Sequence, residues 1–119
     1  MDALVATVER VLSGHRFRYS GERELQTGVE TALRSAGLDV QREASLGDAG
    51  TIDFLLGGLG IEIKVRGTRP DVTRQVHRYL QHGSIAALLL VTTRAELARI
   101  PSVISGKRVF THHLISGAF

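Results

Sequence analysis

The chain has 119 residues and lacks cysteine entirely. That absence excludes disulfides and thiolate metal sites, so any bound metal would need oxygen or imidazole ligands. Long apolar runs are also absent, since none approaches the ~20 residues of a membrane span. The first residues lack the basic, apolar and small-residue segments of a signal peptide. The sequence therefore predicts a cytoplasmic protein with no membrane partner.

Lysine is scarce as well. Of the 15 basic residues, 13 are arginine, and only Lys64 and Lys107 are lysine. In a chain that favours arginine so strongly, a lysine inside an apolar stretch hints at a position that needs a compact ammonium. The net charge of +3 and the pI of about 10 give a modest bias toward polyanions such as nucleic acids.

Helical and strand periodicities alternate along the chain. Helical spacing covers 2–12, 20–36, 71–82 and a short segment at 94–99, and strand patterns cover 38–46, 51–56, 61–65, 85–92 and 107–114. Ser20 and Asp71 are the expected helix caps. This order predicts an α/β fold with a mixed central sheet flanked by helices. No linker interrupts it, so we expect one domain, 1–119.

The segment His15–Tyr19, HRFRY, alternates basic and aromatic residues. One interpretation is a short strand or basic arm in which Arg16 and Arg18 contact a phosphate backbone. The other is a plain connector with solvated arginines. The pattern leaves both open.

The apolar stretch 50–66, GTIDFLLGGLGIEIKVR, carries few charges. Alternation along a strand places Glu62 and Lys64 on one face, and a hairpin pairing can bring Asp53 beside Glu62. Two converging carboxylates repel unless a cation lies between them, and oxygen ligands with water favour Mg²⁺ or Mn²⁺. The alternative is a half-exposed hairpin with a Glu–Lys pair.

Two helices flank this stretch. On the first, Glu22 and Gln26 lie along the apolar stripe, whereas Glu24 falls on the opposite side; Glu22 is therefore expected to face the sheet, unless it only complements the helix dipole. On the second, Gln75 and Tyr79 are four residues apart and so are neighbours. They follow Lys64 closely enough to lie over the end of its strand.

Taken in order, these residues resemble a known superfamily. The series is Glu22, Ile52-Asp53, Glu62-Ile63-Lys64 and Gln75-Val76-His77-Arg78-Tyr79. It resembles the PD-(D/E)XK, or restriction-endonuclease-like, nucleases over about residues 20–92. The Gln-x-x-x-Tyr element is similar to that of the RecB-type branch, and the compact size to Holliday-junction resolvases. One departure is Ile52, where the family name has Pro.

The resemblance implies a fold, an activity and a set of roles. It implies a restriction-endonuclease-like αβββαβ core at 20–92, preceded by a helix and basic arm (1–19) and followed by a helix and strand (93–119). It implies hydrolysis of DNA phosphodiesters with Mg²⁺ or Mn²⁺, held by Asp53, Glu62 and the Ile63 carbonyl. Lys64 would activate water or stabilise the phosphorane.

The remaining implied roles are supporting ones. Glu22 would bind a metal-linked water or a second metal, Gln75 would assist catalysis, and Tyr79 and Gln26 would be accessory. The arginines expected to contact DNA are Arg16, Arg18, Arg66, Arg74 and Arg78. A homodimer is expected if two strands are cut, and structure-directed cleavage is expected because the core leaves little room for sequence reading. The alternative function is a catalytically idle nucleic-acid-binding module or a subunit of a larger complex.

Overall fold

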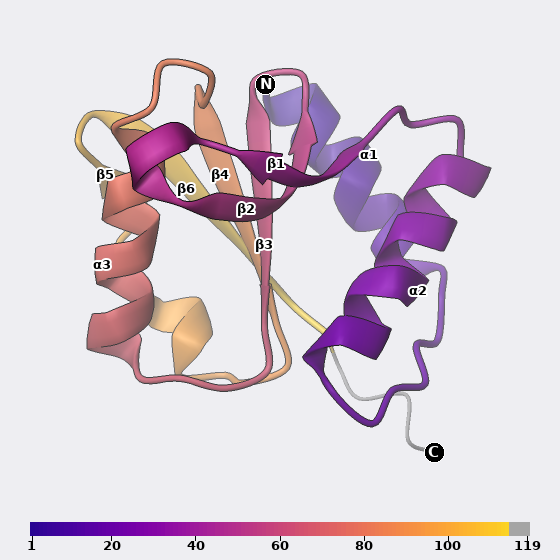
Figure 1. Ribbon diagram of the computed structural model, residues 1–119. Helices are drawn as coiled ribbons and strands as arrows, with labels where there is room; N and C mark the ends of the chain where they lie inside the picture. Colours follow the sequence, from indigo (N-terminus) through magenta and orange to yellow (C-terminus); the bar gives the residue numbers. More distant parts are fainter. Residues whose placement is uncertain (115–119) are drawn as a thin grey trace.

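A computed structural model describes residues 1–114 of the chain. Helices cover both faces of a mixed six-stranded sheet of order β1-β2-β3-β4-β6-β5 (Figure 1). The elements are α1 (Asp2–Ser13), α2 (Glu22–Ser35), β1 (Gln41–Ser45), η1 (Gly47–Ala49), β2 (Thr51–Leu56), β3 (Leu59–Lys64), α3 (Arg69–Leu80), β4 (Ala87–Thr92), η2 (Leu97–Arg99), β5 (Val103–Ile104) and β6 (Lys107–His113). The α/β class and the mixed sheet predicted from the sequence are confirmed.

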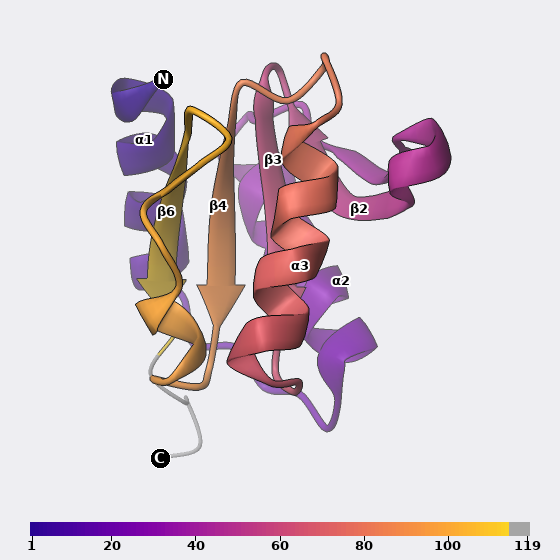
Figure 2. The ribbon, with the colours of Figure 1, turned by 90° about the vertical axis from the view of Figure 1, so that its left-hand side faces the viewer.

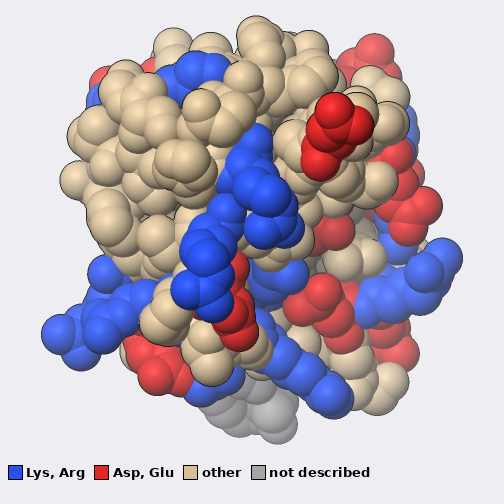
Figure 3. All heavy atoms as spheres, turned by 60° about the vertical axis from the view of Figure 1, so that its left-hand side comes forward, with Lys and Arg blue, Asp and Glu red and all other residues tan. Residues whose placement is uncertain are grey.

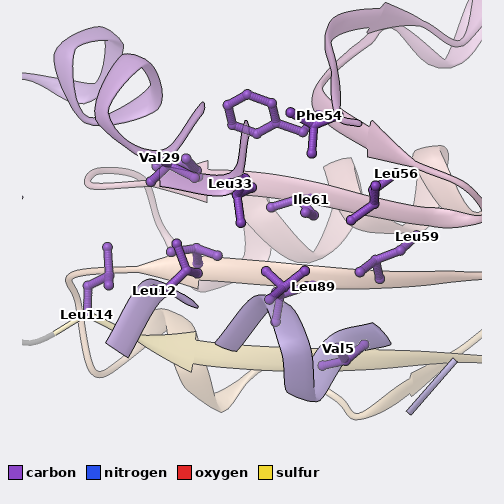
Figure 4. Close-up of a cluster of buried hydrophobic side chains, with 14 of the residues drawn as sticks. Val5, Leu12, Val29, Leu33, Phe54, Leu56, Leu59, Ile61, Leu89 and Leu114 are labelled. Carbon is purple, nitrogen blue, oxygen red and sulfur yellow. The ribbon is translucent and has the colours of Figure 1, made fainter. Parts of the chain in front are cut away.

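The sheet separates two hydrophobic cores. Helices α1 and α2 cover one face and α3 covers the other (Figures 1 and 2). The first core joins the apolar stripes of α1 and α2 to β3 and β4, as Figure 4 shows for Leu12, Leu33, Ile61 and Leu89. The second core packs α3 on the opposite face. Each fully buried aliphatic side chain contributes roughly 1.5–3 kcal/mol relative to an exposed one.

Strands β3, β4 and β6 run parallel in an unbroken ladder. β3 pairs with β4 from Leu59↔Ala87 to Lys64↔Thr92 at every residue, and β4 pairs with β6 in the same continuous way. All six residues of β4 are buried, as expected for a parallel strand covered on both faces. The carboxyl ends of these strands therefore share one edge of the sheet.

The β1–β2 hairpin behaves differently, because it curls over the face of β3. Ile52 belongs to the core beneath α3, whereas Phe54, two residues later, belongs to the core beneath α1 and α2. A Cβ on Gly60 would lie 2.6 Å from the Ile52 Cδ1 atom. A side chain at position 60 would therefore require the Ile52 side chain to move.

Several predicted boundaries need correction. Helix α2 begins at Glu22 with Gly21 as its N-cap, because the Ser20 hydroxyl is engaged with the Glu24 carboxylate at 3.1 Å. Helix α3 is capped by the Thr68 hydroxyl, which accepts the Asp71 amide. A side chain three residues before the amide has the reach that this cap needs.

The C-terminal third also differs from the prediction. The helix expected at 94–99 is a single 3-10 turn, η2, which stops before Pro101 because proline has no amide to continue it. The two-residue strand β5 was missed, since it is too short for an alternating pattern. The connector 15–19 forms no strand, and its Arg16 and Arg18 are exposed.

Candidate active site

The site lies at Asp53, a residue of β2 that is paired with neither neighbouring strand. The β2–β3 ladder ends at Phe54↔Ile61, so the next pair in register, Asp53 and Glu62, lies outside it. The β1–β2 ladder skips the same point: Arg42↔Phe54 and Ala44↔Ile52 are paired, but the intervening residue of each strand is not. Asp53 therefore occupies a break in the sheet on both sides.

Carboxylates replace the missing ladder bonds. The main-chain amide of Asp53 donates to Glu62 Oε1 at 3.1 Å, and the amide of Ile63 donates to Asp53 Oδ2 at 2.8 Å. Two residues on, the amide of Val65 donates to Glu22 Oε1 at 3.1 Å. The three acids thus satisfy backbone groups that a neighbouring strand would otherwise bond, which fixes the position of each carboxylate.

The β3 side chains follow the predicted alternation. Ile61 and Ile63 lie in the core beneath α1 and α2, and Glu62 and Lys64 form an ion pair on the opposite face, with Lys64 Nζ 3.5 Å from Glu62 Oε2. Glu62 is only 3% exposed. The structure thus places Asp53 beside Glu62, as the sequence predicted, although the two residues are not a pair of the ladder.

Helix α2 contributes two polar residues to the site. Besides the Glu22 carboxylate, Gln26 donates its amide to Asp53 Oδ1 at 3.1 Å. Glu24 is exposed, and its carboxylate accepts a hydrogen bond from the nearby Ser20 hydroxyl. The helical stripe therefore distinguished Glu22 from Glu24 correctly in position.

Helix α3 approaches from the other face. Gln75 donates to the Tyr79 hydroxyl at 2.8 Å, and that hydroxyl donates to the Thr51 carbonyl at 2.8 Å and lies 3.5 Å from Glu62 Oε2. The predicted neighbouring of Gln75 and Tyr79 is confirmed. The sequence could not single out Thr51, because Thr51 takes part through its main-chain carbonyl and not through its side chain.

Burial makes the carboxylates of this site difficult to ionise. Desolvation, and then the charge of Asp53, raise the pKa of Glu62 to about 8. The pKa of Asp53 is raised chiefly by burial and secondarily by the charge of Glu22, against the opposing effect of the Ile63 amide. Burial also raises the pKa of Tyr79. With both acids ionised, Lys64 offsets only one of the two charges, which leaves a net negative site.

The side chains of the site can be compared with the ligands that a divalent metal ion requires. Among residues 1–114, no group of three or more His, Asp or Glu side chains is arranged to enclose a metal ion. Mg²⁺ does not require such a cage, because it is bound by one or two carboxylates and keeps several waters. Asp53 and Glu62 therefore fit Mg²⁺ or Mn²⁺ by oxygen chemistry, and a cation bound between them would offset the repulsion from Asp53 that helps to raise the pKa of Glu62. The Ile63 carbonyl remains a predicted ligand.

The five predicted DNA-contacting arginines do not all converge. Arg66 lies two residues after the end of β3, and Arg74 and Arg78 lie on α3; all three are exposed. Arg74 forms an ion pair with Asp71, which offsets part of its charge. Arg16 and Arg18 lie instead in the connector before α2. The structure therefore places two of the five on α3 with Gln75, and Arg66 in the loop that follows Lys64.

Comparison with known proteins adds no assignment. No protein-family model, curated protein or solved structure matches the chain. Within residues 1–114, no helix is long and apolar enough to span a membrane.

Proposed function

We propose that the chain is a divalent-metal-dependent nuclease of the PD-(D/E)XK type that hydrolyses DNA phosphodiester bonds. The observation that carries the proposal is the interlocked pair of Asp53 and Glu62, with Lys64 beside it, at a break in the sheet. A surface Glu–Lys pair would not need this burial or these main-chain bonds. The element sequence α2-β1-β2-β3-α3-β4 supports the restriction-endonuclease-like core that the resemblance implies.

In this proposal the chain supplies both metal ligands and electrostatic stabilisation. Asp53 and Glu62 would hold Mg²⁺ or Mn²⁺, which acts as a Lewis acid on the scissile phosphate. The Lys64 ammonium, held by Glu62, would stabilise negative charge on the phosphoryl oxygens or orient the attacking water. Glu62 fixes this ammonium through one oxygen and the Asp53 backbone through the other.

The outer residues would position these groups. Gln26 and the Ile63 amide each hold one oxygen of Asp53, which leaves its remaining lone pairs in a defined direction. Tyr79, held by Gln75, fixes the start of β2 through the Thr51 carbonyl. A homodimer stays a prediction, and it would allow both strands of a duplex to be cut.

The test is metal-dependent cleavage by the wild-type protein. Supercoiled plasmid, linear duplex, single strand and a four-way junction are incubated with Mg²⁺, Mn²⁺ or EDTA. The Glu22→Gln and Glu24→Gln variants form a matched pair on one helical turn. We expect cleavage with metal only, strongly reduced by Glu22→Gln and unchanged by Glu24→Gln. Absence of cleavage on every substrate would favour the idle nucleic-acid-binding module instead.

A further inference from the structure

A groove of about 510 Å³ lies between the first turns of α3 and the segment around η2. Its lining residues are Arg69, Pro70, Thr73, Arg74, Arg99 and Pro101. Three of the six are arginines, and none is acidic. The groove therefore combines an apolar floor with a positive rim.

Two of these arginines have uncompensated charges. Arg69 and Arg99 are exposed, and within residues 1–114 neither guanidinium has a hydrogen-bond or ion-pair partner. Other arginines are engaged differently: Arg34 and Arg42 share the Glu30 carboxylate, and Arg74 pairs with Asp71. Arg18, Arg23 and Arg66 likewise have no side-chain partner among residues 1–114, so Arg69 and Arg99 differ in sharing a groove lined by no acid, where both guanidiniums are available to an anion.

The groove lies at the carboxyl-end edge of the sheet, on the side of α3 that faces η2, whereas Gln75 and Tyr79 of the candidate active site lie on the opposite side of α3. β3 ends at Lys64, and the following loop leads directly into Arg69. Arg94, which follows the end of β4, donates to the Gly67 carbonyl at 2.9 Å and so joins this loop to the segment that leads into η2. In Figures 1 and 2 the start of α3 and η2 lie side by side at this edge.

The wider surface carries both signs. Figure 3 shows a run of Lys and Arg side chains across the side of the molecule on which α3 lies, with Asp and Glu side chains beside several of them. Among these acids, Asp71 pairs with Arg74 and Glu96 with Arg94. Guanidinium groups bind phosphates through paired donors, and proline rings and arginine stems can pack against sugars. A protein partner would need an acidic surface of matching shape, whereas a phosphodiester backbone supplies regular charge and sugar together.

We propose that the groove between α3 and η2 binds the sugar–phosphate backbone of the nucleic-acid substrate on the other side of α3 from the cleavage site, through Arg69 and Arg99. This inference rests on the proposed nuclease function for its substrate, but binding can be measured without cleavage. It adds two arginines that the sequence did not single out, since neither occupies a recognisable motif.

The test compares two double variants that each remove two positive charges. Arg69→Ala/Arg99→Ala changes the groove, and Arg10→Ala/Arg108→Ala changes two exposed arginines away from it, on α1 and at the start of β6, where Arg10 bonds Thr7 and Arg108 pairs with Asp2. Binding to a fluorescent duplex of about 20 base pairs, long enough to span several phosphate contacts, is measured in EDTA over a salt titration. Circular dichroism checks that each variant is folded.

The groove variant is expected to bind about 10-fold more weakly or worse at about 0.1 M salt, with a log–log salt slope reduced by about 2, because two phosphate contacts are lost. The control should keep both the affinity and the slope near wild type. Arg69→Lys/Arg99→Lys, which retains the charge, should keep most of the slope. Inorganic phosphate at equal ionic strength should compete weakly, because it lacks the linked backbone.

The outcomes separate this inference from the proposed function. Equal affinities and slopes for the groove and control variants would overturn the groove assignment, even if the wild type cleaves DNA. So would full competition by inorganic phosphate at micromolar concentration, which would indicate a free-phosphate site. Weaker binding by the groove variant alone, with no cleavage by the wild type, would support the groove and reject the nuclease.

Discussion

The two halves of the sheet differ in how completely their strands are paired. In the half formed by β3, β4 and β6, every residue of the ladder is paired and β4 is wholly buried. In the half formed by β1 and β2, the ladder is interrupted at Asp53 on both sides, and side-chain carboxylates take over main-chain amides. Regular pairing stabilises the chain but leaves no main-chain polar group unpaired, so the candidate site forms where Glu62 and Lys64 of the regular strand β3 meet the interrupted strand β2.

The strongest test of this comparison sets a variant of the interrupted half, expected to lose activity, against a variant of the continuous half, expected to lose stability. Asp53→Asn should reduce metal-dependent cleavage by about 10²-fold or more, because a charged ligand worth several kcal/mol is removed, and should leave the protein folded. Leu89→Ala, in the continuous half, should lower the free energy of unfolding by about 2–5 kcal/mol without changing the rate per folded molecule. Single-turnover cleavage and urea unfolding measure the two effects. Near-normal cleavage by Asp53→Asn would contradict the metal-site assignment.

The two lysines provide a second contrast. Lys64 contacts a carboxylate of the site, whereas Lys107 donates to the His82 and Ile85 carbonyls at 3.2 and 2.6 Å. Lys64→Ala should lower the cleavage rate by about 10²-fold with little loss of DNA affinity, and Lys64→Arg should not restore it fully. Lys107→Ala should instead cost about 1–3 kcal/mol of stability through unsatisfied carbonyls. A Lys64→Ala variant that alters only DNA affinity would favour the binding module.

The buried acid of the site predicts a pH dependence of stability without metal. The pKa of Glu62 is about 8 in the folded state, against an ordinary value of 4.5. The folded state therefore binds this proton more tightly, so the contribution of Glu62 to stability is fully present below about pH 4.5 and is lost as the pH rises toward 8. Glu62→Gln should remove this part of the slope, and Mg²⁺ should restore stability to the wild type near the upper end of that range. Thermal unfolding in EDTA across about pH 5–9 measures it; identical slopes for the two proteins would show that Glu62 does not cause the dependence.

The sequence predicted most of the regular structure because burial imposes periodicity. Alternation in 61–65 placed Glu62 and Lys64 together, and helical spacing separated Glu22 from Glu24. It predicted the wrong caps for α2 and α3, since Ser20, Thr68 and Asp71 are all good capping residues and only the geometry decides among them. Gln26 was singled out as accessory, yet its bond to Asp53 depends on the distance between α2 and β2, which no local pattern encodes.

The left-handed backbone conformation of Glu43 could not be predicted from the sequence either. Glu43 has φ 51°, a conformation that non-glycine residues rarely adopt, and it is the residue of β1 that lies opposite Asp53 in register. Such outliers cluster at functional sites, where the surrounding structure maintains them. In this hairpin the outlier coincides with the interruption of the β1–β2 ladder, so it accompanies the bend that carries Asp53 out of that ladder.

Replacing Glu43 tests whether this bend matters to the site, and its effect is the smallest expected. Glu43→Gly should stabilise the protein by up to about 1 kcal/mol, because relief of a strain of about 1–2 kcal/mol outweighs the added backbone entropy. Glu43→Val should destabilise it, since a β-branched residue resists positive φ, and should weaken Mn²⁺ binding by favouring a regular ladder at Asp53. Ser105, with φ 53° in the β5–β6 turn, is the matched control. Ser105→Val should lose stability but bind Mn²⁺ normally in calorimetry, and equal Mn²⁺ affinities for both valine variants would show that the bend does not position Asp53.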